Sequence, residues 1–202
     1  MKKIILSAMA LVAFSFASAQ ETSNIPTNST GFKMGDFFAT GSIGIGSEST
    51  GNNKSNSFNI SPRVGYFLMD NIAVGAALGY ESGKTKTPGA PDFKQEQFSI
   101  GVFGRYYITP ASGFSLFGQL GLDYINATTK VDVPGGPKNS SNAFQLGLAP
   151  GVNYFVSSNF ALEATFGILS FRTDSPDEGD NTDNFNFGLN FTNINLGLIY
   201  RF

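Results

Sequence analysis

Few residue types in this chain could carry out chemistry. Its 202 residues include no histidine and no cysteine, so the most common general base and the thiol nucleophile are both missing. A serine–lysine pair or two carboxylates could still act together, but no local spacing forces such residues into proximity. We therefore predict no catalytic residue, and we expect that the protein is not an enzyme.

Two glycine-rich stretches are similar to nucleotide-binding loops but differ from them in spacing and context. Residues 79–85 read GYESGKT, with three residues between the glycines where a phosphate loop has four, and no helix is expected after them. Residues 41–46 read GSIGIG, which crowding on a strand face explains better than a dinucleotide site. We therefore predict no cofactor.

An acidic segment, residues 173–184, is the strongest candidate for a cation site. It carries five acids, whose spacing does not match an EF-hand loop: Asp174, Asp177, Glu178, Asp180 and Asp183. We expect a solvated surface loop without a specific metal site. Alternatively, the loop shares divalent cations that bridge anionic surface glycolipids.

From residue 36 onward, bulky apolar residues recur at every second position, which is the period of a β-strand. The pattern predicts eight strands, over residues 36–47, 56–68, 72–83, 95–108, 114–127, 142–155, 160–172 and 185–202. The predicted connections alternate in length. Residues 48–55, 84–94, 128–141 and 173–184 form long polar loops, and the three connections between them are short. This alternation is typical of an outer-membrane barrel, with its long loops outside the cell and both termini in the periplasm.

Each predicted strand has two contrasting faces. In 142–155, Phe144 and Leu146 alternate with Gln145 and Gly147. The bulky face suits lipid, and the small polar face suits the narrow interior of an eight-stranded barrel. We therefore predict an all-β fold, a transmembrane eight-stranded antiparallel up-and-down β-barrel over residues 35–202. The alternative is a soluble periplasmic ligand-binding barrel.

Charged and amide side chains on the small face predict a salt-bridged polar network that plugs the lumen, because an unpaired charge in a narrow lumen is costly. The predicted network consists of Arg63, Arg105, Glu163, Arg201, Asp123, Glu81, Gln119 and Gln145, with Asn153 beside them. A functional alternative is that these charges line an ion path.

The N-terminus has the pattern of a cleaved secretory signal peptide over residues 1–19. Lys2 and Lys3 precede an apolar stretch, which ends in the small residues Ala17, Ser18 and Ala19. A polar segment without periodicity, residues 20–34, predicts a flexible periplasmic lead-in. The formal net charge of −2 gives no reason to expect nucleic-acid binding.

The signal peptide, the first strand GDFFATGSIGIGS at 35–47 and the terminal GLIYRF at 197–202 together resemble the small outer-membrane barrels of the OmpA/OmpX-like and porin-like class, especially Bacteroidetes-type members. The resemblance implies a location in the outer membrane of a Gram-negative bacterium. It also implies that Tyr200 and Phe202 form a C-terminal signal for the barrel assembly machinery. Other expected partners are outer-membrane lipids, surface glycolipid and an unknown extracellular partner at the loops.

We expect a monomer with a structural or surface-interaction role. A narrow porin for small solutes is the alternative function. The last strand also predicts a β-bulge near Thr192 and Asn193, because the apolar positions are odd-numbered before this point and even-numbered after it.

Overall fold

The structure is a computed structural model that describes residues 30–167, 169–177, 179–188 and 194–202. It contains ten strands in these ranges: β1 Phe37–Thr50, β2 Asn53–Met69, β3 Ile72–Lys86, β4 Phe93–Tyr107, β5 Phe114–Val131, β6 Lys138–Phe155, β7 Phe160–Phe166, β8 Leu169–Pro176, β9 Thr182–Phe187 and β10 Ile194–Arg201. No helix among the described residues is long and apolar enough to cross a membrane.

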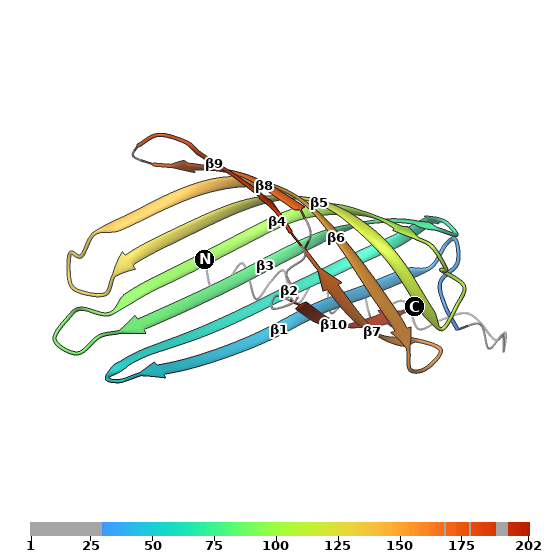
Figure 1. Ribbon diagram of the computed structural model, residues 1–202, viewed down its shortest axis with the longest axis horizontal. Coiled ribbons are helices and arrows are strands. Elements are labelled where there is room, and N and C mark those ends of the chain that lie inside the picture. Colours follow the sequence, from blue (N-terminus) through green and yellow to red (C-terminus); the bar gives the residue numbers. More distant parts are fainter. Residues whose placement is uncertain (1–29, 168, 178, 189–193) are drawn as a thin grey trace.

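The ten strands build an eight-stranded antiparallel barrel (Figure 1). Strands β7 and β8 both pair with β6 and form the seventh barrel strand, while β9 and β10 form the eighth. The sheet closes where β1 pairs with β10, from Phe38 opposite Arg201 to Gly41 opposite Leu198. The predicted fold is therefore confirmed.

The predicted long polar loops are largely strand, which corrects the sequence analysis. The first connection is a two-residue turn, because Thr50 already pairs with Asn53 and the positive φ of Gly51 permits so tight a reversal. The other three connections shrink to residues 87–92, 132–137 and 177–181. Polar residues continue the antiparallel pairing of these strands. The resulting hairpins project from one end of the barrel (Figure 1).

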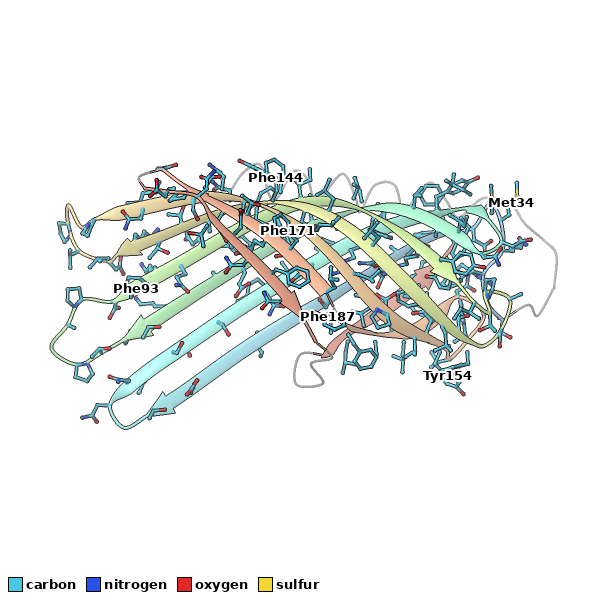
Figure 2. All side chains as sticks on the ribbon, turned by 45° about the horizontal axis from the view of Figure 1, so that its top comes forward. Met34, Phe93, Phe144, Tyr154, Phe171 and Phe187 are labelled. Atoms are coloured by element: carbon cyan, nitrogen blue, oxygen red, sulfur yellow. The ribbon has the colours of Figure 1, made fainter. Side chains whose placement is uncertain are left out.

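The outward face is apolar, as predicted. Phe144, on β6, is 60% exposed and Leu120, on β5, is 53% exposed, whereas Phe103 and Arg105 on the inner face of β4 are buried. Figure 2 shows Phe144 and Tyr154 projecting from the outer face of β6. A belt of exposed large apolar side chains matches the hydrocarbon of a membrane and does not match water.

The last strand is interrupted, and the bulge predicted at Thr192 and Asn193 lies outside the described residues. Phe187 pairs with Leu169 and Ile194 pairs with Phe166. The last strand thus advances seven positions where its neighbour advances three. Among the described residues, β1 pairs with β2 alone beyond Gly41.

We expect that Leu120→Arg lowers the free energy of unfolding by about 2–4 kcal/mol, because it places a charge midway along the lipid-facing side of β5. Urea titration in lipid vesicles, followed by far-UV circular dichroism, measures the change. Ser49→Arg, near the polar tip of β1, is the matched control and should leave stability nearly unchanged. Equal effects of the two substitutions would contradict a lipid-facing belt.

Candidate functional site: the closed base and the lumen

A buried ion pair crosses the lumen near the end with the short turns, here called the base. Arg105 on β4 and Glu163 on β7 meet from opposite walls of the barrel. Arg105 Nη1 donates to Glu163 Oε2 at 2.6 Å, and Nη2 donates to Oε1 at 3.1 Å. Both side chains are almost completely buried. This two-pronged geometry is the strongest form of a charged hydrogen bond, and it offsets the cost of removing both charges from water.

Neighbouring polar groups use the remaining hydrogen-bonding capacity of Arg105. Its Nε donates to Gln119 Oε1 at 2.8 Å, and its Nη1 also donates to the Tyr107 hydroxyl at 3.2 Å. Asn153 donates its amide to the same hydroxyl at 3.3 Å. The guanidinium lies 4.5 Å from the centroid of the Phe117 ring, within cation–π distance. The predicted network contains only charged and amide side chains, so it leaves out Tyr107.

Three lumenal phenylalanines fill the space around this pair, and each of the three faces a glycine on the adjacent strand. A Cβ at any of these glycines would overlap the ring opposite. The pairs are Phe38 with Gly65, Phe103 with Gly75, and Phe117 with Gly151. Glycine therefore makes room for rings in a lumen too narrow for two bulky neighbours.

The N-terminal segment closes the base. Phe32 is 1% exposed and packs against Phe67 at 4.7 Å and Phe155 at 4.9 Å between ring centroids. Its backbone N–H donates to the carbonyl of Pro110 at 2.7 Å. The sequence predicts a flexible segment over 20–34, but residues 31–34 contact the barrel; residues 20–29 lie outside the described ranges. This contact could not be predicted from the sequence, because so short a segment shows no periodic pattern.

Arg201 anchors the same segment from the last strand. Its Nη1 donates to the carbonyl of Gly31 and lies 3.7 Å from Asp36 Oδ2. Burial raises the pKa of the Asp36 carboxyl, while the hydrogen bond from the Lys33 N–H and the charge of Arg201 act in the opposite direction. Arg201 thus belongs to the closure at the base.

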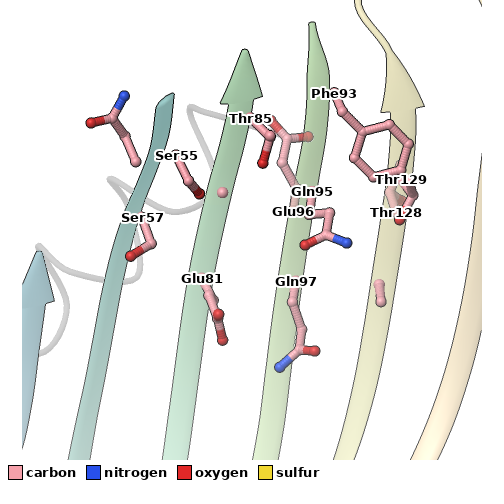
Figure 3. A pocket seen from close by; sticks show the side chains of 13 residues that line it. Ser55, Ser57, Glu81, Thr85, Phe93, Gln95, Glu96, Gln97, Thr128 and Thr129 are labelled. Atoms are coloured by element: carbon pink, nitrogen blue, oxygen red, sulfur yellow. The ribbon is translucent and has the colours of Figure 1, made fainter. Parts of the chain in front are cut away.

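The other predicted network residues lie farther toward the hairpin end. Arg63, Asp123 and Gln145 line a cavity of about 210 Å³ beyond Arg105, here called the lumenal cavity. Glu81 lines a larger opening of about 550 Å³, here called the outer recess, in which Figure 3 shows Glu81 and Gln97 at one level. Of the eight predicted residues, Arg105, Glu163 and Gln119 are in direct contact with one another through Arg105.

Ion pairs join the projecting strands at the mouth of the barrel. Lys94 contacts Asp132 at 2.6 Å, and Lys84 contacts Asp92 at 2.7 Å. The hydrogen bond from Lys94 lowers the pKa of Asp132. In the acidic segment, Asp174 accepts two-pronged bonds from Arg172. The described residues contain no group of three acids placed to hold a metal ion. The predicted lack of metal, cofactor and catalytic sites stays a prediction.

We expect that Glu163→Ala lowers the free energy of unfolding by about 3–5 kcal/mol, because it leaves the buried Arg105 charge without its partner. The double variant Arg105→Leu/Glu163→Leu should lose less, since it removes both charges. Urea titration in lipid vesicles measures both. Glu81→Ala is the control and should change stability by no more than about 0.5 kcal/mol. A double variant less stable than Glu163→Ala would refute the explanation.

Comparison with known proteins places this architecture among outer-membrane barrels. OprG from Pseudomonas aeruginosa is 15% identical, with 86% of this chain and 99% of OprG aligned at a TM-score of 0.51. Neisserial surface protein A is 21% identical over 83% of this chain and 99% of its own, with a TM-score of 0.45. Ail, the attachment invasion locus protein of Yersinia pestis, is 17% identical over 84% and 99%, with a TM-score of 0.47. At 15% identity, the likeness to OprG supports the fold alone.

No curated protein sequence matches the chain. The predicted class of small outer-membrane barrels is confirmed, whereas the Bacteroidetes type stays a prediction. A family model, described as the outer membrane protein beta-barrel domain, matches residues 6–202. The chain therefore belongs to the outer-membrane β-barrel family, whose members span the outer membrane of the Gram-negative envelope.

Proposed function

We propose that the protein is a structural outer-membrane barrel that makes contacts at the cell surface, with a lumen closed at the periplasmic end. The observation that carries this proposal is the packing of the base. Arg105 and Glu163 cross the lumen, and Phe32 lies buried beneath them against Phe67 and Phe155. A base filled with rings and a paired charge leaves solutes no route through the barrel.

The projecting hairpins support the surface role. Beyond the apolar belt, β1 and β2 continue with polar residues up to the turn at Gly51, and β5 and β6 do so up to residues 132–137. Strand extensions held by backbone pairing and ion pairs form a rigid contact surface. Binding of a partner there costs little conformational entropy, because the protein is already ordered. Lipid and surface glycolipid are the proposed neighbours of the belt, and the protein acts as a monomer.

The alternatives differ in what they require of the lumen and the outer face. A soluble periplasmic barrel is incompatible with a belt of exposed side chains such as Leu120 and Phe144. A narrow porin needs a continuous path through the base. The packing of Phe32 and Arg105 argues against such a path.

In planar lipid bilayers, we expect the purified protein to show no stable conductance steps. Phe32→Ala combined with Arg105→Ser and Glu163→Ser should show steps, because it removes one of the buried rings of the base and the ion pair that crosses the lumen. Heat-modifiable gel migration checks that both proteins are folded. Stable steps from the wild-type protein would overturn the closed lumen in favour of the porin.

We infer that Tyr200 and Phe202 mark the chain for the assembly machinery. The two rings are in edge contact, with centroids 4.8 Å apart. Phe202→Ala should lower the amount of heat-modifiable barrel in the outer-membrane fraction several-fold, while Phe202→Tyr should preserve it. Phe98→Ala removes a lipid-facing ring elsewhere and controls for loss of an aromatic. Equal yields of Phe202→Ala and wild type would disprove the assembly role.

A further inference from the structure

One row of facing residues frames the lumenal cavity. Arg63 on β2 faces Ala77 on β3, Ala77 faces Gly101 on β4, and Gly101 faces Asp123 on β5. Adjacent strands lie about 4.8 Å apart, so two small residues separate the strands that carry the charges. The Asp123 carboxylate extends over Gly101, where a Cβ would overlap it, so Ala77 is the open part of the floor between the anion and the cation.

The two charges face the same space without touching. Arg63 and Asp123 both line the cavity of about 210 Å³ and act on each other electrostatically. Among the described residues, neither forms an ion pair or a side-chain hydrogen bond. The neighbouring cations are engaged elsewhere, because Arg105 binds Glu163 and Arg172 binds Asp174. Two charges of opposite sign thus remain available to a solute.

We propose that the lumenal cavity binds a small zwitterion, with its carboxylate at Arg63 and its ammonium group at Asp123. A simple anion would be attracted by Arg63 but repelled by Asp123. A simple cation would be attracted by Asp123 but repelled by Arg63. A molecule that carries both charges satisfies both with charge-assisted hydrogen bonds. The amides of Gln97 and Gln145 also line the cavity and can donate to or accept from the bound molecule.

The solute enters from the hairpin end. Gln97 lines the outer recess, where Figure 3 shows it, and also lines the lumenal cavity, so the two spaces adjoin. Binding requires the row from Arg63 to Asp123 and not the closed base. Failure of this proposal would therefore leave the closed lumen untouched, and a conducting lumen would leave this proposal untouched.

Calorimetric titration of the purified protein in detergent micelles tests the ligand class. Glycine is the zwitterionic probe, while acetate and methylamine each carry one of its two charges. We expect saturable binding of glycine, and binding at least tenfold weaker for acetate and for methylamine. Absence of saturable glycine binding, or acetate binding as tightly as glycine, would overturn the proposal.

Three variants test the assigned positions. Arg63→Gln and Asp123→Asn should each weaken glycine binding at least tenfold, and Ala77→Leu should abolish it by filling the floor while keeping both charges. Glu81→Gln, in the outer recess, is the matched control and should bind like wild type. Far-UV circular dichroism and heat-modifiable migration identify any variant that fails to fold, and the comparison of the three probes on the wild-type protein remains decisive. Unchanged binding in a folded Arg63→Gln variant would refute the site.

Discussion

Hydrocarbon offers no hydrogen-bond partner to the backbone, and the architecture of this chain follows from that constraint. Backbone groups within the hydrocarbon need partners in the sheet, so the sheet closes on itself where β1 meets β10, from Phe38 to Gly41. Closure gives each strand one face toward lipid and one toward the lumen. The lipid face can be bulky and apolar, whereas eight strands leave an interior that side chains almost fill.

The narrow interior explains the unusual composition. The chain has 24 glycines and 21 phenylalanines, and three phenylalanines in the lumen each face a glycine, as Phe38 faces Gly65. A ring takes the space that the opposite residue gives up. The same crowding removes water from Arg105, so that its charge is stable only with Glu163 in direct contact. The phenylalanine–glycine pairs and the Arg105–Glu163 ion pair thus both follow from the small volume of the lumen.

The sequence predicts the parts of this structure that depend on period two. The strands, the two faces and the barrel follow from alternation, which also predicts that Arg105 and Glu163 point into the lumen. Contacts that depend on the register between strands cannot be predicted from alternation. Arg63 and Arg105 share the lumen face of their strands, but the register pairs Arg63 with the row of Asp123 and leaves Arg105 two lumen-facing levels below.

Two further features could not be predicted from the residue types alone. The polar ends of the strands look like loops, because serine, asparagine and lysine favour turns when no ladder partner is known. Phe32 lies in a segment without any period, so its burial depends entirely on the barrel that it enters. The signal peptide lies outside the described residues, and it stays a prediction together with the assembly role of Phe202.

The hydrogen bond from Arg201 to the carbonyl of Gly31 joins residues that are 170 positions apart in the chain. The floor of the barrel is therefore assembled from its first and its last segments. A growing or truncated chain without β10 has no Arg201 to hold Gly31 and no strand to complete the sheet beside β1. This contact at the base can therefore form only after β10 is in place, so it links the position of the N-terminal segment to completion of the sheet.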